Sequence, residues 1–240
     1  MKTDVVYFNT KKTFNNHLEL RFSLRSLQQY VTGIKDVYIV GALPDWVNQE
    51  KVKFIQKADN YRRNKDANII KKMIMCCVDK QISDPFLYVN DDHFFTKKTK
   101  ANEFPFYHKG ELYSDSSNAM YRSRINTTRS MLKEKKLPIL NYDVHTPILI
   151  YKEQFLKSFE GIDYAETYMV MKSWYMNNWI GFDKGVEITD CKFNGSERRS
   201  LLKLKPLVKK RPCFSTSDIL SKQVMNLLHC LYTYESKYEK

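Results

Sequence analysis

Two adjacent carboxylates, Asp91 and Asp92, directly follow a short apolar run and are the strongest candidates for chemistry in this sequence. Residues 86–89 are apolar, aromatic or β-branched, a pattern that predicts a buried strand. Because burying two charges is costly, we expect the chain to leave the sheet there. Open α/β sheets bind ligands at the carboxyl ends of their strands, and carboxylate oxygens suit Mg²⁺ or Mn²⁺ bridging a substrate diphosphate. The alternative is a solvated turn over residues 90–92.

His145 is the candidate general base for an acceptor hydroxyl, because imidazole changes its protonation state near neutral pH. It lies in a polar turn that leads into an apolar run predicted to be a strand. The same side chain can equally be a metal ligand. A single histidine is more often structural, so a purely structural role is a third alternative.

Several basic and amide side chains are candidates for holding the diphosphate of a donor. Arg21 and Arg25 lie four residues apart in a predicted helix, where they repel each other unless an anion or a carboxylate lies between them. A bidentate clamp on a diphosphate and pairing with protein carboxylates are both open for these two residues. The other candidates lie at predicted strand ends or in polar loops, and they are Asn9, Arg62, Arg63, Asn90, Arg198 and Arg199.

The composition indicates a globular protein with an anionic partner. The chain has 240 residues, of which 42% are hydrophobic and 14% aromatic, and its formal net charge is +13. Residues 192–211 hold eight basic side chains and one acidic side chain, which predicts either a solubilising surface or a phosphate-binding patch. The five cysteines lack metal-site spacing. With no secretory leader and no membrane-spanning run evident, we expect a cytoplasmic protein.

Strand and helix patterns alternate in the first part of the chain. Strands are predicted at residues 5–8, 37–40, 52–55 and 86–89, and helices at 17–31 and 67–82. This βαβ pattern predicts a mostly parallel, mixed sheet flanked by helices. No Gly-rich phosphate loop follows the first strand, which argues against a Rossmann dehydrogenase and against a P-loop enzyme.

The later part of the chain is predicted to be mainly helical. We interpret residues 1–240 as a single catalytic domain, with a core over about 1–150 and an elaboration over about 151–240. Helices are predicted at residues 118–135, 152–159, 164–178 and 217–234, and strands at 112–114, 147–150 and 185–192.

Several of these stretches together resemble one known family. Residues 19–27 read E-L-R-F-S-L-R-S-L, residues 34–40 read I-K-D-V-Y-I-V, residues 44–46 read P-D-W, and residues 86–92 read F-L-Y-V-N-D-D. In this order they resemble the second conserved block of the Stealth-type phosphotransferases, which include capsular polysaccharide and GlcNAc-1-phosphotransferases. The resemblance is good over residues 17–95, while H-T-P at 145–147 and F-S-T-S-D at 214–218 resemble later blocks more weakly.

The resemblance implies a glycosyltransferase-A-like fold, a nucleotide-sugar donor, and Mg²⁺ or Mn²⁺ at Asp91 and Asp92. Within the family motif before the second helix only Asn68 matches, and it is added to the donor-binding candidates. The first strand is followed by F-N-T instead of the family's W-V-D-G, so glycosyl transfer and sugar-phosphate transfer are both open.

We therefore expect a metal-dependent transferase that moves a glycosyl or sugar-1-phosphate group to an acceptor hydroxyl, with Asp92 and His145 at the reacting centre. The expected acceptor is a polysaccharide or another glycan. One alternative is a glycosyltransferase acting on modified bases of DNA, and another is a basic nucleic-acid-binding module without catalysis. The oligomeric state does not follow from the sequence.

Overall fold

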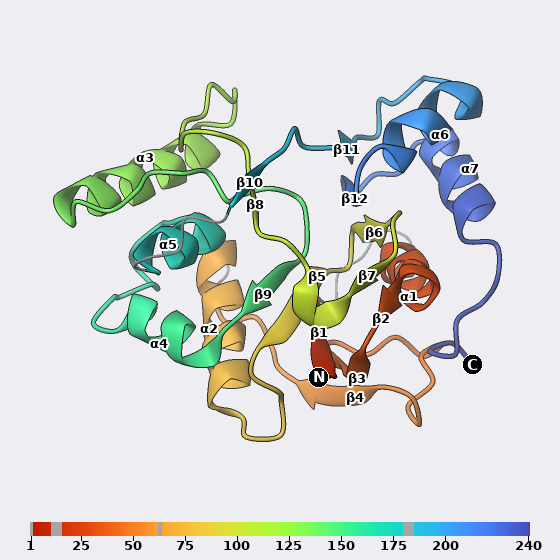
Figure 1. Cartoon of the computed structure of the whole chain (residues 1–240), viewed down its shortest axis with the longest axis horizontal. Coiled ribbons are helices and arrows are strands. Elements are labelled where there is room, and N and C mark those ends of the chain that lie inside the picture. Colours follow the sequence, from red (N-terminus) through yellow and green to blue (C-terminus); the bar gives the residue numbers. More distant parts are fainter. Residues whose placement is uncertain (1, 11–15, 62–63, 180–184) are drawn as a thin grey trace.

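The apolar runs of the first part of the chain form one five-stranded sheet at the centre of the molecule (Figure 1). The computed structural model describes residues 2–10, 16–61, 64–179 and 185–240. The strand order is β4-β3-β1-β5-β9, in which the first four strands are parallel and β9 runs antiparallel to β5. Their bounds are β1 (Thr3–Asn9), β3 (Ile34–Gly41), β4 (Lys53–Gln56), β5 (Phe86–Asn90) and β9 (Ile148–Ile150). The predicted mixed, mostly parallel sheet is confirmed.

Helices cover both faces of this sheet, and the alternation of side chains along β1 shows why. Val5 and Tyr7 pack in a cluster with residues of α1 (Leu18–Tyr30). Val6 and Phe8 point to the other face and pack in a cluster with α2, α4 and α5. Because both faces are covered, all seven residues of β1 are buried. The three helices of the second face are α2 (Lys65–Val78), α4 (Lys152–Phe159) and α5 (Met171–Asn178).

A smaller sheet lies beside α1 and carries the chain after Asp91 and Asp92. Its order is β11-β12-β6, with β12 antiparallel to β6 and parallel to β11. A third cluster of buried side chains lies in this part of the molecule and includes Phe94, Phe214 and Leu228. The elements of this part are β6 (His93–Phe95), β11 (Lys192–Phe193), α6 (Leu201–Lys209), β12 (Cys213–Thr216) and α7 (Lys222–Leu231). The remaining elements are β2 (Val31–Thr32), β7 (Thr99–Lys100), η1 (Ala101–Glu103), β8 (Tyr107–His108), α3 (Ala119–Glu134) and β10 (Val186–Glu187).

Several element predictions for the later part of the chain were wrong. The predicted helix 164–178 begins only at Met171, because the carbonyl groups of Tyr164 and Ala165 accept hydrogen bonds from the Asn64 side chain that caps α2. The predicted strand 185–192 is two separate two-residue strands, β10 and β11. Residues 112–114 form no strand, and α6 was not predicted.

The second and last predicted helices are shorter than expected. α2 ends at Val78 instead of residue 82. Directly after its end, the Asp79 carboxylate accepts a hydrogen bond from the backbone N–H of Gln81. α7 begins at Lys222, where Ser221 caps it, instead of at residue 217. None of the helices in the described ranges is long and apolar enough to cross a bilayer. All five cysteines are free thiols.

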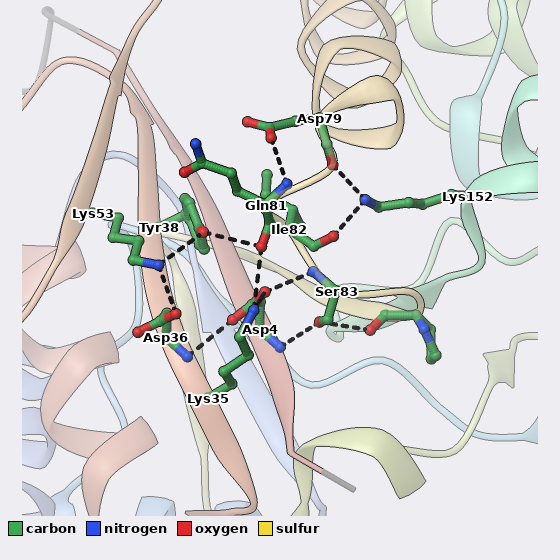
Figure 2. A network of polar contacts seen from close by, with 11 residues as sticks. Asp4, Lys35, Asp36, Tyr38, Lys53, Asp79, Gln81, Ile82, Ser83 and Lys152 are labelled. Atoms are coloured by element: carbon green, nitrogen blue, oxygen red, sulfur yellow. Dashed lines mark hydrogen bonds and ion pairs between the residues drawn. The ribbon is translucent and has the colours of Figure 1, made fainter.

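The buried carboxylate of Asp4 fixes the amino-terminal edge of the central sheet (Figure 2). It accepts hydrogen bonds from the backbone N–H groups of Asp36, at 3.0 Å, and Ser83, at 2.6 Å. The Lys35 ammonium lies 3.4 Å away. The carboxylate therefore joins β1 to β3 and to the segment before β5, at the sheet edge opposite to Asp91 and Asp92.

We expect Asp4→Ala to lower the free energy of unfolding by about 2–4 kcal/mol, because it leaves two backbone N–H groups without their acceptor. Asp36→Ala is the matched control, since it removes a partly exposed carboxylate paired with Lys53 and should cost about 0–1 kcal/mol. Urea unfolding of the two variants measures the difference. Equal losses in both variants would contradict this account of the edge.

Candidate functional site

The fold brings four separate chain segments to the carboxyl edge of β5. Asp91 and Asp92 form the turn between β5 and β6. Because β9 is antiparallel to β5 and Ile148 pairs with Tyr88, the loop that carries His145 arrives at the same edge. In the smaller sheet Ser215 pairs with both His93 and Lys192, so Lys192 and the segment after β12 also come close to the turn.

Two serines of α1 hold the β6 strand that follows the carboxylates. The Ser23 hydroxyl donates to the His93 carbonyl at 2.6 Å, and the Ser26 hydroxyl accepts from the Phe95 backbone N–H at 3.0 Å. Both serines are fully buried. One side of β6 pairs with β12, so these hydroxyls satisfy backbone groups on its other side. The S-L-R-S part of the helix motif thereby fixes the position of the turn.

The Asp91 and Asp92 carboxyl groups lie in a poorly solvated, negatively charged site. Burial and then the neighbouring Asp92 and Glu19 carboxylates raise the pKa of Asp91 above its usual range. Burial also raises the pKa of Asp92, while Lys192, His145 and Lys172 oppose that rise. The Lys192 ammonium lies 3.8 Å from an Asp92 carboxylate oxygen. A cation placed here would reduce the electrostatic repulsion between two ionised carboxylates.

Within the described part of the chain, three buried polar atoms at this site have no hydrogen-bond partner. They are Asp92 Oδ1, His93 Nε2 and Ser215 Oγ. His93 Nδ1 accepts from the Asn90 backbone N–H at 3.3 Å, and burial lowers the pKa of His93 well below its usual value. The neutral imidazole therefore carries its proton on Nε2, 3.8 Å from Asp92 Oδ1. These unsatisfied atoms mark a place for a water, an ion or a ligand oxygen.

His145 is oriented by Asp190, a residue that the sequence analysis did not single out. Asp190 accepts from the His145 backbone N–H at 2.9 Å, and its other oxygen lies 3.2 Å from His145 Nδ1. Burial opposes ionisation of Asp190, but the hydrogen bond from His145 and the nearby Lys109 ammonium outweigh it and lower the pKa of Asp190. Nδ1 of His145 therefore holds a proton facing an ionised carboxylate, and Nε2 is left as the acceptor.

Lys172 supports the same loop from inside the protein. Its ammonium group donates to the carbonyls of Val144 at 2.9 Å and Thr146 at 2.8 Å, the two residues that flank His145. Burial lowers the pKa of Lys172, and Asp143, Asp190 and Asp92 counteract this effect. Lys172 thus fixes the backbone of the His145 loop and places a positive charge near Asp92.

The oxygen ligands at the turn fit a hard divalent cation only in part. The side chains of Asp91 and Asp92 are of the right type, and the unpaired Asp92 Oδ1 is available. Within the described ranges, no three His, Cys, Asp or Glu side chains lie close enough to form a complete metal cluster. Mg²⁺ commonly takes one or two carboxylates and completes its shell with water and substrate phosphates, so the pair suits a cation that arrives with a diphosphate.

Arg21 and Arg25, predicted as donor-binding residues, are paired with a protein carboxylate. Arg25 donates to both carboxylate oxygens of Glu239, at 2.9 and 2.7 Å, and Arg21 lies 3.5 Å from the same group. The Arg21 guanidinium also stacks over the Trp46 ring at 4.6 Å. The structure therefore favours the alternative of carboxylate pairing, and this pairing ties α1 to residues 236–240.

The other donor-binding candidates are spread over the molecule. The Asn9 amide donates to the Ala42 carbonyl, and Asn68 holds the backbone of residues 60–61, so both amides already have structural partners. Arg199 pairs with Glu197 on the surface. Arg198 donates to the nearby carbonyl groups of residues 195 and 197 and lines an open groove of about 600 Å³ beside Lys192 and Asp218. Asn90 adjoins the Asp pair, whereas Arg62 and Arg63 lie outside the described residues.

The structure adds Glu19, Lys172, Asp190 and Lys192 to the site. Glu19 stands in the first turn of α1 and accepts a hydrogen bond from the Thr216 hydroxyl. Its place at the start of the E-L-R-F-S-L-R-S motif was the only sequence signal for a role. Lys172 and Asp190 carried no local signal, because their importance comes from contacts with the distant residues 144–146.

Comparisons with known proteins bear on the same segment. Residues 13–113 match the family model described as Stealth protein CR2, conserved region 2. The Stealth resemblance is confirmed over this region. The matched residues 13–113 contain both the helix motif and Asp91 and Asp92, so the serine contacts from α1 to β6 lie within them.

Two curated relatives align with this part of the chain. The human N-acetylglucosamine-1-phosphotransferase subunits alpha/beta protein is 27% identical over 108 residues, which cover 41% of this chain and 8% of that protein. The capsular polysaccharide phosphotransferase of Neisseria meningitidis serogroup B is 26% identical over 108 residues, which cover 41% of this chain and 28% of that protein. The chain thus spans less than a third of the length of these relatives.

A solved structure, that of an active-site mutant of LgtC, is similar in fold over nearly the whole chain. The TM-score is 0.50 at 11% sequence identity, and the match covers 98% of both chains. LgtC has a glycosyltransferase-A fold. The likeness in fold therefore extends beyond residues 13–113 to the later part of the chain, including the loop of His145 and β12.

Glu19 generates a pH-dependent prediction. Burial and the Asp92 and Asp218 carboxylates raise the pKa of Glu19 from 4.5 to about 7. A carboxyl whose pKa is higher in the folded state loses stability as pH rises from the unfolded value to the folded value. We therefore expect the stability of Glu19→Gln relative to the wild type to increase by about 1–2 kcal/mol as the pH rises from about 5 to about 8. A chelator is present so that no metal ion contributes. Chemical unfolding at both pH values measures this gain. The exposed Glu50→Gln variant should show no such trend, and a flat difference for Glu19→Gln would refute the assignment.

Proposed function

We propose that the protein is a metal-dependent transferase that takes a nucleotide-sugar donor and moves sugar-1-phosphate to an acceptor hydroxyl. The observation that carries the proposal is the position of the Asp91–Asp92 turn and the Asp190–His145 pair at one edge of the central sheet. The match to a Stealth conserved region and the names of the two relatives, both phosphotransferases, support a phosphosugar over a glycosyl group.

Each group at this edge has a role in the proposed reaction. His145 Nε2 accepts the proton of the acceptor hydroxyl, while Asp190 holds Nδ1–H and stabilises the imidazolium that forms. Lys172 keeps the loop of His145 in place. Asp91 and Asp92 would hold Mg²⁺ or Mn²⁺, which when bound supplies positive charge to the donor diphosphate. Lys192 adds a fixed positive charge at the same place.

The open groove beside Asp218 is the proposed place for the part of a substrate that extends away from the reacting centre. It has a volume of about 600 Å³ and begins at Lys192, whose ammonium lies near Asp92. Its walls combine the cationic Arg198 with the apolar Ile219, a combination that suits a sugar or a phosphate. A glycan acceptor would fit this surface. Among the described residues no contact favours DNA as the acceptor, and the DNA alternative rests on net charge alone.

The released nucleotide distinguishes the two reactions that the sequence left open. Attack of the acceptor oxygen on the phosphorus next to the sugar breaks the bond between the two phosphates and releases a nucleoside monophosphate. Attack on the anomeric carbon breaks the bond from carbon to oxygen and releases a nucleoside diphosphate. We expect the monophosphate when a panel of nucleotide sugars is incubated with Mn²⁺ and glycan acceptors, analysed by anion-exchange chromatography.

The double variant Asp91→Asn/Asp92→Asn should lower this release by at least about 10²-fold, since it removes the charge that would hold the cation. Asp45→Asn/Glu50→Gln removes two exposed carboxylates elsewhere and should leave the rate unchanged. Release of a nucleoside diphosphate would show that the protein transfers a glycosyl group and not a sugar phosphate. Equal rates in the wild type and the Asp91→Asn/Asp92→Asn variant would overturn the proposed site.

His145→Gln should lower kcat by about 10²–10⁴-fold with little change in donor binding, because it removes the proton acceptor and keeps the size of the side chain. Asp190→Asn should give a smaller loss, because the imidazole loses the carboxylate that holds its Nδ1–H and fixes its orientation. Steady-state rates over a pH series measure both effects. A purely structural His145 would instead reduce activity and thermal stability together, with the shape of the pH profile unchanged.

A further inference from the structure

The outward face of α6 combines an exposed leucine with lysines. Leu204 and Val208, four residues apart, are fully buried in the cluster that contains residues of α7. Leu202, of which 85% is exposed, lies on the side of α6 away from these two residues, whereas Leu207, of which 38% is exposed, lies on the flank of the helix. An apolar side chain that is exposed to water contributes no burial energy to the fold, so this face has the character of a contact surface.

The charge of this face is uniformly positive. Residues 201–211 contain five basic side chains and no acidic one. In the part of the chain that the structure describes, none of the five takes part in a salt bridge, whereas Lys53 and Lys192, on other elements, both do. Lys97 lies against the end of α6, where its ammonium donates to the Lys210 carbonyl at 3.2 Å. The five residues are Lys203, Lys205, Lys209, Lys210 and Arg211.

We propose that α6 and residues 210–211 dock the protein onto the surface of an anionic lipid bilayer. At such a surface leucine side chains enter the boundary between headgroups and acyl chains, while lysines beside them meet lipid phosphates. A nucleic acid or an anionic glycan would use the lysines but would leave Leu202 in water. The combination of both features on one helix face favours the lipid surface.

Docking through α6 has a consequence for the candidate site. Only Pro212 separates Arg211 from β12, and β12 leads directly to Asp218 beside the open groove. The segment that lines the groove would therefore be held close to the membrane surface. The docking proposal stands independently of the reaction, since its surface includes none of the residues placed at the reacting centre.

The test is flotation of the full chain with vesicles. Wild-type protein should float with vesicles of equal parts phosphatidylglycerol and phosphatidylcholine, and not with vesicles of phosphatidylcholine alone. Leu202→Gln and Lys209→Gln/Lys210→Gln should each reduce the floating fraction at least about fivefold. All of these positions are exposed, so the fold should persist, and circular dichroism verifies this.

Matched controls distinguish docking through α6 from nonspecific adsorption to the vesicles. Val78→Gln alters an exposed apolar residue at the end of α2, and Lys51→Gln/Lys80→Gln removes two exposed lysines near the amino-terminal edge of the sheet. Both should float like the wild type. Absence of flotation with the anionic vesicles would overturn the proposal. So would flotation that Leu202→Gln leaves unchanged while duplex DNA competes for it, because that result would show a general polyanion surface.

Discussion

The candidate site depends on the buried hydroxyls of Ser23 and Ser26, which hold β6 against α1. These two contacts fix the backbone immediately after Asp91 and Asp92 at His93 and Phe95. β5 fixes the start of the β5–β6 turn in the central sheet, and these two contacts fix its far end against α1. The helix is itself anchored at its other face, where Arg21 and Arg25 meet Glu239. A motif that looks like a substrate-binding helix is therefore first a structural support.

Electrostatics gives the site its chemical character. Burial raises the pKa of Asp91, Asp92 and Glu19, and the Asp92 carboxylate further raises the pKa of both Asp91 and Glu19. Two lysines oppose the rise in the pKa of Asp92, Lys172 from beneath the His145 loop and Lys192 from the smaller sheet. A protein gains no stability from an arrangement of this kind, so its presence at the carboxyl edge of a parallel sheet points to function.

Local pattern predicted the central sheet and the Asp pair, because a buried strand that ends in carboxylates is encoded in seven consecutive residues. The partner of His145 could not be predicted in this way. Asp190 lies 45 residues away and reaches His145 only through the fold. The same holds for Glu239, which is 214 residues from Arg25. α6 escaped prediction because Pro206 and its lysines obscure a helix whose buried side is only Leu204 and Val208.

Binding of Mn²⁺, followed by electron paramagnetic resonance in the presence of a nucleoside diphosphate, tests the central claim most directly. The account predicts one bound Mn²⁺ per chain in the wild type, with affinity that rises when the diphosphate is added, because the described residues supply only part of the coordination shell. It also predicts loss of this ion in Asp91→Asn/Asp92→Asn and its retention in Asp45→Asn/Glu50→Gln. Stoichiometric Mn²⁺ binding that survives removal of both Asp91 and Asp92 carboxylates, or no binding in the wild type, would contradict it.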